Sequence, residues 1–438
     1  KSVIKKQADE DTATNFFGSK IKMSKLTDEA RAFVGLTGLG FNVFAGLSNA
    51  FMGNVQMVLE AIGGQYFNKT DLASAELQYW KLIPEGRKEI NAPIKTANLG
   101  LLIDKFDVLE DYYENLRRAG YYGSALERII GNANTRFMMG MGEHYLHVKT
   151  MLAMMRHNKV LYNNKKISLY DAYETVTENG ATFLRVKEGV TKLDGTALTE
   201  NDLEEFKMKV MKVNAIMNGS FKDTDKGVIQ GSCLGKLAMQ FRQWMPEHYY
   251  RRFARTYYNA QLGEMREGYY NTLWKFGIDS LKDIKRMKFS FITNYHSLSM
   301  AEKANVKKAL AEMTFFWVLT IMLGSMGNVD DKKGLWGQRM LLYQLKRLKL
   351  DVGASTISPD IFTNAMTILQ SPMAAVKTFN NLGDLIQFNN LGHEITTGRY
   401  KGWSEYYRDF IETVPLYNQF RRMFALSPEN YMFKILDT

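Results

Sequence analysis

The chain has 438 residues, of which 45% are hydrophobic and 24% charged, a balance typical of folded proteins that excludes wholesale disorder. A single cysteine, Cys233, excludes an internal disulfide framework and a cysteine-ligated zinc cluster. The formal net charge of +11 is spread along the chain, and it favours anionic partners such as DNA, lipid headgroups or an acidic protein wall.

Two residue types occur in unusual numbers. Seven prolines are few for this length and permit long helices, whereas 25 methionines are many. Because methionine is unbranched and flexible, it fills irregular gaps and repacks easily. The simpler interpretation is an ordinary hydrophobic core whose gaps are filled by flexible methionine side chains. The sharper one is a core suited to unfolding and repacking.

The N-terminal part combines a polar segment with an uncharged one. Residues 1–31 are polar and charged, and we expect an arm or linker there. Residues 32–59 carry no charge and, at about 1.5 Å per helical residue, are long enough to cross a bilayer. Within them, small and amide residues recur at every fourth position, at Gly38, Asn42, Gly46, Ala50 and Asn54. This stripe predicts a buried, close-packed helical hairpin, with a conditional membrane segment and a loop as alternatives.

Long helices are expected over residues 96–160. The segment LIDKFDVLEDYYENLRRAG alternates charged and apolar residues at helical spacing, and Gly120 at its end is a suitable stop. A helical apolar stripe follows, made of Phe137, Met141, Tyr145, Val148 and Leu152. We therefore interpret residues 32–160 as one helical region.

The pattern changes between residues 161 and 198, where short β-prone runs replace helical spacing. One pair of runs flanks Asn163-Asn164 and another flanks Asp194-Gly195, which are residues that tight hairpin turns favour. These residues predict a β-hairpin insert between helices. A helix restarts after Thr199, the expected N-cap, with Asp202 three residues later.

The remaining chain is divided into a helical region over residues 199–330 and a C-terminal helical region over residues 331–438. A second uncharged stretch, residues 313–329, follows the basic segment KANVKKALAEM. It is short for a membrane span and has two aspartates on its far side, so we expect a core helix.

The segment GKLAMQFRQWMPEHYYRRFARTYYNA, residues 235–260, is rich in arginine and aromatic residues. We expect Pro246 to end or kink one helix and a second helix to follow it. In that second helix Tyr249, Phe253 and Tyr257 would share one face, with Arg251 and Arg255 roughly 200° around the axis. A stacking surface for single strands needs aromatic rings beside the cationic groups. The pattern therefore favours an aromatic core face and a basic outer face.

The basic outer face supplies the candidate contact residues of this segment. They are Arg242, Arg251, Arg252 and Arg255. They would face DNA or the acidic wall of a partner protein, and a membrane-surface helix is the remaining alternative.

No motif in the sequence favours catalysis. The glycine-rich GLTGLG lacks the strand–loop–helix context of a nucleotide site. Glu143 and His147 share a helix face, but His144 points elsewhere and no third strong ligand is near, which favours a structural histidine pair over a metal site. Cys233 has no paired histidine motif. We expect no enzyme, no cofactor and no metal in this chain.

Three segments carry a family resemblance. They are FNVFAGLSNAFMGNVQMVLEAIGGQYF, MNGSFKDTDKGVIQGSCLGKLAMQFRQWMPEHYYRRF and ILQSPMAAVKTF. Together they resemble the very large internal virion proteins of crAss-like tailed phages of gut Bacteroidetes and related large polyvalent phage proteins. The resemblance covers most of residues 32–420 in order, and none of its motifs is a catalytic signature.

The resemblance implies a cargo protein that is stored in the capsid or tail barrel and ejected into the host with the genome. It also implies a segment of a longer polypeptide, present in several copies. The implied partners are the portal or tail-barrel wall, packaged DNA and, after ejection, the host membrane.

These features predict a mainly α fold, an elongated multi-helix assembly with small inserted β-hairpins. The expected function is that of a non-catalytic virion cargo protein. The alternatives are a membrane-active protein that forms a conduit in the host envelope and a DNA-binding scaffold. An enzyme module, such as a cell-wall hydrolase, finds no support in the sequence.

Overall fold

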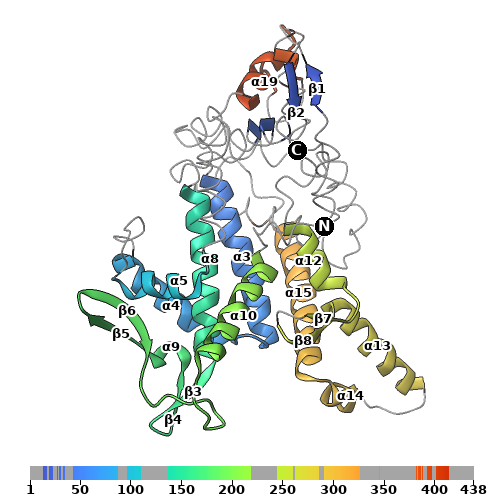
Figure 1. Cartoon of the computed structure of the whole chain (residues 1–438). Coiled ribbons are helices and arrows are strands. Elements are labelled where there is room, and N and C mark those ends of the chain that lie inside the picture. The colour runs from blue at the N-terminus through green and yellow to red at the C-terminus, as the bar shows by residue number, and fades with distance from the viewer. Residues whose placement is uncertain are drawn as a thin grey trace.

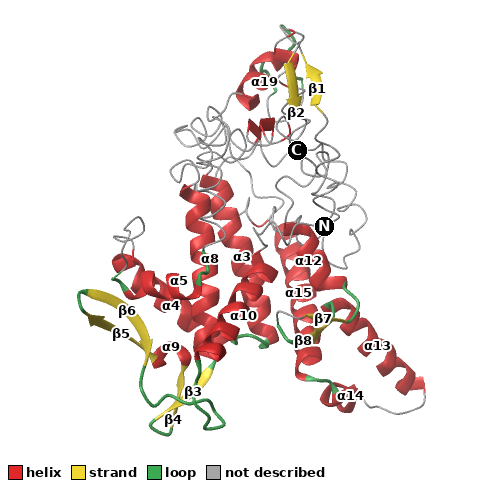
Figure 2. Cartoon of the chain, in the orientation of Figure 1, coloured by secondary structure: helices red, strands yellow, loops and turns green. Residues whose placement is uncertain are grey.

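A computed structural model describes residues 43–86, 96–109, 137–218, 244–259, 262–285, 291–325, 392–396 and 401–413, with the short strands 13–16 and 19–22 and a few single residues near 27–34, 345 and 381–387. Helices dominate this part of the chain, and the strands form two-stranded antiparallel hairpins (Figure 2). The predicted mainly α fold with small β-hairpins is confirmed.

The helices form two packed groups (Figure 1). The N-terminal group consists of α3 (Val43–Gly63), α4 (Lys69–Gly86), α5 (Asn98–Phe106), α8 (Phe137–His157), the short α9 (Leu169–Ala172) and α10 (Glu200–Asn218). The C-terminal group consists of α12 (Trp244–Phe253), α13 (Tyr269–Lys285), α14 (Phe291–Ser297) and α15 (Met300–Ser325). A further helix, α19 (Glu405–Thr413), lies near the top of the view.

Helix α8 is the centre of the N-terminal group, because α3, α4 and α10 all pack against it. Its buried side chains belong to the largest hydrophobic core of the described chain. Methionines are prominent in that core: Met57, Met151, Met154, Met155 and Met217 are all buried. The methionine richness of the sequence is therefore partly a property of the core itself, where flexible side chains fill the gaps between helices.

The predicted close packing occurs between α3 and α8, but one position away from the predicted stripe. A methyl group added to Gly53 would overlap the buried side chain of Leu146 on α8. Gly46 and Ala50 lie in α3, whereas Gly38 and Asn42 lie outside the described residues. The described part of the expected hairpin is one continuous helix, Val43–Gly63.

Helix α5 ends earlier than the sequence pattern predicts. It stops at Phe106 because Asp107 adopts a left-handed conformation, with φ of 48°, and its N–H bonds back to the carbonyl of Asp104. Val108 and Leu109 then turn into the core. The expected continuous helix to Gly120 is therefore wrong at Asp107, and residues 110–136 lie outside the described part.

The hairpin at Asn163-Asn164 is confirmed. Strands β3 (Lys159–Tyr162) and β4 (Lys165–Ser168) pair antiparallel with Tyr162 opposite Lys165. The two asparagines have φ of 50° and 59°, which fits the two-residue turn that matches the twist of the strands.

The second predicted hairpin lies elsewhere than expected. Strands β5 (Tyr173–Glu178) and β6 (Ala181–Val186) pair across Asn179-Gly180. The turn at Asp194-Gly195 carries only a single bridge between Thr191 and Ala197. Because Thr191 also pairs with Leu161 of β3, this segment extends the first hairpin instead of forming its own.

Two further hairpins were not predicted. Strands β1 (Ala13–Phe16) and β2 (Ser19–Lys22) lie within the expected polar arm. Strands β7 (Tyr257–Asn259) and β8 (Glu264–Arg266) follow α12 directly.

The capping prediction for α10 is confirmed. The Thr199 backbone N–H donates to the Asp202 carboxylate at 2.8 Å, and the Asp202 N–H donates to the Thr199 hydroxyl at 3.3 Å. The Thr199 hydroxyl also donates to the Asp202 carboxylate, at 2.6 Å, and this bond together with that from the Thr199 N–H lowers the pKa of Asp202 to about 2. Helix α10, which the sequence assigned to the region 199–330, packs against α8 and closes the N-terminal group.

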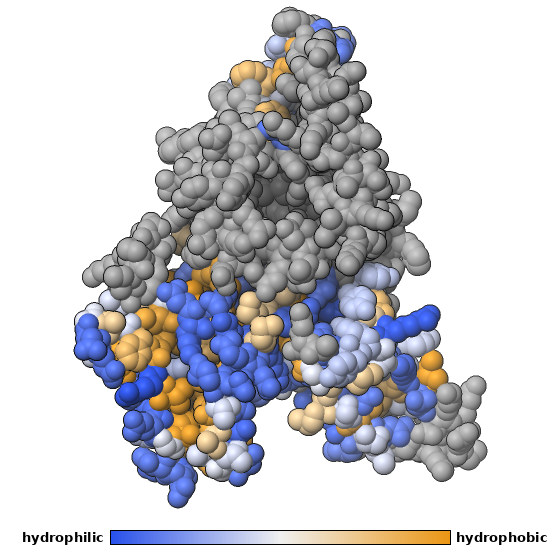
Figure 3. Space-filling model, in the orientation of Figure 1, coloured by the Kyte–Doolittle hydropathy of each residue, from blue (hydrophilic) through white to orange (hydrophobic). Residues whose placement is uncertain are grey.

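Helix α15 joins two segments that the sequence analysis treated separately, the basic KANVKKALAEM and the uncharged stretch after it. Phe316 and Leu319 are buried against α3, whereas Trp317, Val318 and Ile321 are 48–67% exposed. The expected core helix is therefore buried on one side only. Figure 3 shows hydrophobic patches among hydrophilic residues on both helical groups. None of the described helices has the length and apolar character that a membrane span requires.

Candidate functional site

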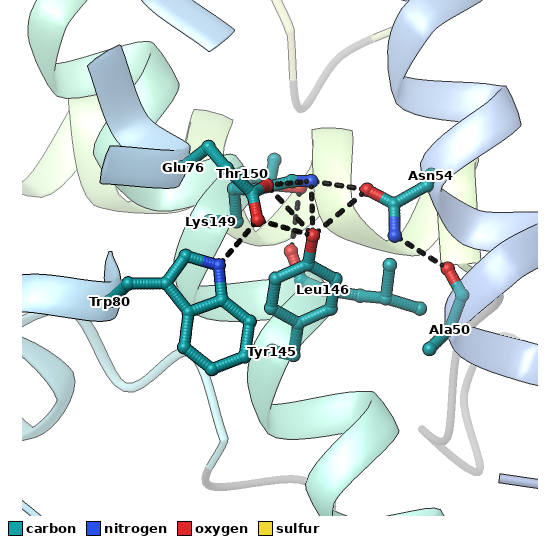
Figure 4. A network of polar contacts seen from close by, with 8 residues as sticks. All are labelled: Ala50, Asn54, Glu76, Trp80, Tyr145, Leu146, Lys149 and Thr150. Carbon is teal, nitrogen blue, oxygen red and sulfur yellow. Dashed lines mark hydrogen bonds and ion pairs between the residues drawn. The ribbon is translucent and has the colours of Figure 1, made fainter. Parts of the chain in front are cut away.

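A closed network of polar side chains connects α3, α4 and α8 (Figure 4). At its centre is Lys149 of α8, whose side chain is 3% exposed. Its ammonium donates to Glu76 Oε2 at 2.7 Å, to the Tyr145 hydroxyl at 2.8 Å and to the Asn54 side-chain oxygen. The ammonium has three donors, and all three are matched.

The groups around Lys149 are also bonded to one another. The Tyr145 hydroxyl donates to Glu76 Oε2 at 2.7 Å, and the indole N–H of Trp80 donates to Glu76 Oε1 at 2.6 Å. The Asn54 amide donates to the carbonyl of Ala50 within α3. The network therefore ties α3, α4 and α8 together through their polar side chains.

The protonation states of this network are those of an ion pair. Burial pushes the pKa of Glu76 upward, but the hydrogen bonds that it accepts outweigh burial and hold that pKa below its ordinary value. Burial lowers the pKa of Lys149 despite the opposing pull of Glu76. Burial and Glu76 raise the pKa of Tyr145, so its hydroxyl stays protonated. The network therefore holds the charges of Lys149 and Glu76 in a fixed arrangement.

A second charged pair joins the two helical groups. Lys308 of α15 and Glu60 of α3 are 2.6 Å apart, with side chains 7% and 5% exposed. The aliphatic part of the Lys308 side chain lies over Gly63, and a methyl group added at Gly63 would overlap it. Burial lowers the pKa of Lys308. Burial also acts to raise the pKa of Glu60, but the attraction of Lys308, together with that of Arg251 and Arg266, lowers the pKa of that carboxyl.

Other polar contacts surround this pair and complete the junction between the groups. Arg251 of α12 donates to Gln56 of α3, and Tyr66 donates to Glu264 of β8. Burial raises the pKa of Tyr66 well above its ordinary value. At the other end of the same helix pair, Phe316 and Leu319 pack against apolar residues of α3, so α3 and α15 run antiparallel. The junction is thus polar at one end and apolar at the other.

A third buried pair lies inside the C-terminal group. Arg252 of α12 is fully buried and forms two hydrogen bonds with the carboxylate of Glu312 on α15. Its guanidinium also donates to the His248 carbonyl at 2.9 Å. Tyr269 and Tyr270 of α13 donate to Glu312 Oε2 at 2.5 and 3.0 Å. Burial opposes the charge on Arg252, but Glu312 prevails and raises the Arg252 pKa.

The structure corrects the predicted orientation of the arginines. Arg252 is buried and Arg251 is half-buried against α3, so neither lies on an open basic face. The physical reason is the carboxylate of Glu312, which gives Arg252 a partner in the core. Arg255 is exposed as expected, and Arg242 lies outside the described residues.

The predicted aromatic core face is present only in part, because Tyr249 contacts Phe253, with ring centroids 4.8 Å apart, but is itself exposed. Tyr249 is 63% and Tyr250 47% exposed. Helix α12 ends at Phe253, so Tyr257 lies in strand β7 and not on a third turn. A helix does cover the residues after Pro246, but it begins at Trp244, with the proline in its first turn, where the missing N–H is harmless. The helix expected before Pro246 lies outside the described residues.

Glu143 and His147 do contact each other. His147 Nε2 lies 3.1 Å from Glu143 Oε2, and the other ring nitrogen lies 3.2 Å from the Val108 carbonyl. Asn49 of α3 donates to Glu143 at 2.7 Å. His144 points away to the Tyr79 hydroxyl. Within the described residues no group of three His, Cys, Asp or Glu is placed to hold a metal ion.

The sequence did not predict that Lys149, Lys308 and Glu312 would form buried ion pairs, although one signal was available. Lys149 interrupts the apolar run YLHVKTMLAMM, and Lys308 and Glu312 lie one turn apart on one helix. A charge on an otherwise apolar helix face indicates a buried partner. The partner itself cannot be found this way, because Glu76 is 73 residues away from Lys149.

The chain matches no family model, no curated protein and no solved structure. What the protein does is therefore inferred from its own residues and their geometry.

Proposed function

We propose that this chain is a non-catalytic virion cargo protein, stored in the capsid or tail barrel and ejected into the host with the genome. The observation that carries the proposal is how the fold is held together. Helices far apart in the sequence are joined by buried ion pairs around a methionine-rich core, and the sequence has one cysteine and hence no internal disulfide. The three segments that resemble phage internal virion proteins support the same proposal.

A cargo protein that passes a narrow channel must unfold and later refold. Buried ion pairs suit this task because desolvation offsets much of their attraction, so they add little net stability compared with apolar residues. When one partner of a buried ion pair leaves the core, the other is left there without a counter-charge. The helices that the pair joins are therefore expected to separate together. Once the chain is open, the freed charges are hydrated again. Methionine side chains repack without needing one fixed arrangement.

The partner expected inside a virion is anionic. The net charge of +11 favours packing beside DNA or beside a negatively lined barrel. Several copies of a chain with this charge would repel one another in one compartment unless an anionic partner neutralised the charge.

The experiment that tests the proposal is mass spectrometry of purified virions before and after their contents are ejected. Peptides of this chain are expected in full particles and lost from emptied ones. Peptides that stay in emptied particles would assign the chain to the shell or tail, and absence from both preparations would overturn the virion assignment.

A further inference from the structure

The outward face of α15 is uncharged along the second half of the helix. Its exposed residues lie four, three and four positions apart, with one more beside them, and the four apolar ones are 48–67% exposed. These residues form the α15 seam, which consists of Leu310, Thr314, Trp317, Val318 and Ile321. Single exposed apolar residues need no explanation, but a contiguous row on one helix indicates an interaction surface.

The opposite side of α15 is already packed within the chain. Ala309 is buried against α13, and Phe316 and Leu319 are buried against α3. At 3.6 residues per turn, the α15 seam points roughly the opposite way from these three side chains. Helix α15 is therefore apolar on two sides, a pattern typical of a helix that is covered all round, whereas the described residues cover one side.

The α15 seam lacks the charges that an anionic partner would require. Between residues 310 and 325 the sequence has one charged residue, Glu312, and its side chain is buried against Arg252. Nucleic acid needs cations at the contact, and a helix lying in a membrane surface carries them along its polar face. The cations on this face of α15, Lys303 and Lys307, lie only at its N-terminal end. An uncharged seam with this spacing fits another uncharged helix face.

The α15 seam is complementary in size to an antiparallel second copy of itself. A two-fold axis between Thr314 and Trp317 places each tryptophan against the smaller threonine of the other copy. The same axis brings Leu310 of one copy against Ile321 of the other. Parallel pairing would instead set Trp317 against Trp317 and bring the two Lys307 side chains together, which like charges oppose. Size and charge therefore both favour the antiparallel arrangement.

The area of the α15 seam is sufficient for a reversible dimer. Four apolar side chains, each about half exposed or more, together with Thr314 present roughly 500 Å² per copy, so pairing buries about 1,000 Å² in total. This area is at the lower end for a specific interface, so the two copies are expected to exchange in solution.

We infer that the α15 seam binds a second copy of this chain in an antiparallel, two-fold symmetric helix pair. Trp317 is the central contact, because a large aromatic ring in the middle of an interface contributes most of the binding free energy. Its ring already lies edge-on against the buried Phe316, with centroids 6.4 Å apart, so little side-chain freedom is lost on pairing. Self-association is a property of the isolated chain, so it can fail without affecting the virion proposal, and the reverse also holds.

The test is sedimentation velocity of the full chain at increasing protein concentration, where the wild type is expected to pass from monomer to dimer. Ile321→Glu places a charge in the apolar contact and should raise the dissociation constant by roughly 100-fold or more. The matched control is Leu77→Glu on α4, because Leu77 is 65% exposed and Ile321 67%. The control should dimerise like the wild type, and circular dichroism should be the same for all variants.

A pair of opposite charges tests the antiparallel direction. Leu310→Lys should dissociate the dimer as Ile321→Glu does. The double variant with both substitutions should dimerise again, because the antiparallel pair sets the new ammonium of one copy beside the new carboxylate of the other. Within one helix the two positions are about 16 Å apart, too far to neutralise each other. A double variant that stays monomeric would overturn the antiparallel pairing.

Three other results would overturn the inference. They are a wild type that stays monomeric at every concentration, a dimer that survives Ile321→Glu, and an equal loss of dimer in Leu77→Glu. Flotation with vesicles of phosphatidylcholine and phosphatidylglycerol distinguishes a lipid partner. A monomer that floats with the vesicles, and no longer does so in Ile321→Glu, would assign the α15 seam to a membrane surface instead of a second copy.

Discussion

At the scale of single residues, the buried charges of this protein are matched by partners from other helices. Lys149, Arg252 and Lys308 each meet a carboxylate that comes from a different element. Such pairs add little net stability, but they specify which helices meet, since a wrong partner leaves a charge unpaired in the core. His144 and His248 follow a different rule, because burial lowers the pKa of both side chains.

His144 makes stability depend on pH in a defined window. Burial lowers its pKa to about 4 from an ordinary value of 6.5, so the unfolded state takes up a proton first as the pH falls. Stability is fully present above about pH 6.5 and is lost as the pH falls toward about 4, by at most about 3 kcal/mol from this group. Urea denaturation across that range should show the decline.

The control for this prediction is a pair of substitutions. His144→Gln should flatten the pH dependence between these values, and His296→Gln, at an exposed position, should leave it unchanged. Burial also lowers the pKa of His248, so some decline remains in the first variant. An unaltered slope in His144→Gln would contradict the assignment.

At the scale of elements, α12 and α13 approach so closely that only glycine fits between them. A methyl group on Gly268 would lie 2.6 Å from backbone atoms of Arg252 and Ala254. Asn271, one turn into α13, donates to the carbonyls of Phe253 and Ala254 and ties the same two ends together. The placement of α13 against the end of α12 therefore depends on this contact.

Gly268→Ala should destabilise the protein by about 2 kcal/mol or more, because backbone atoms cannot move aside as a side chain can. Gly277→Ala is the matched control. Gly277 lies within α13 with open space around it, so alanine there should stabilise by about 0.5–1 kcal/mol. Thermal unfolding of the two variants should shift in opposite directions, and equal shifts would contradict the close approach.

The sequence predicts the existence of the elements better than their ends and their orientation. Thr199 and Asp202 identify the start of α10 because a capping box is local in the chain. The end of α5 at Asp107 could not be predicted, since its left-handed turn depends on burying Val108 and Leu109. The orientation of α12 was inverted because periodicity favours aromatic residues for the core. Periodicity carries no information about a carboxylate far away in the sequence, such as Glu312, which pairs with Arg252 in the core.

At the scale of the whole molecule, two helical groups meet along α3 and α15. Each group has buried apolar residues of its own, and their junction is polar around Glu60 and Lys308. Separation at that end exposes charged groups that water solvates well. When a pulling force acts on the chain, the two helical groups are therefore expected to separate first at this junction.

Replacing one member of the pair should weaken the fold strongly, whereas replacing both should not. Lys308→Met alone leaves Glu60 buried and unpaired, and we expect a loss of about 3–5 kcal/mol. The double variant Glu60→Leu with Lys308→Met should equal the wild type or exceed it by up to about 4 kcal/mol. Chemical denaturation of the single and double variants measures both. A double variant as unstable as the single one would show that the pair is needed for more than charge balance.

The wide sequence separation of Glu60 and Lys308 also has a consequence for biosynthesis. The main core draws nearly all its side chains from residues 57–217, so it is complete long before α15 has been made. Contacts between distant parts of a chain form slowly, and N-terminal units generally fold first as they leave the ribosome. During translation the N-terminal group is therefore expected to fold while the side of α3 that packs against α15 is still exposed to solvent. A chain that ends before residue 300 should contain the folded N-terminal group with this side of α3 uncovered.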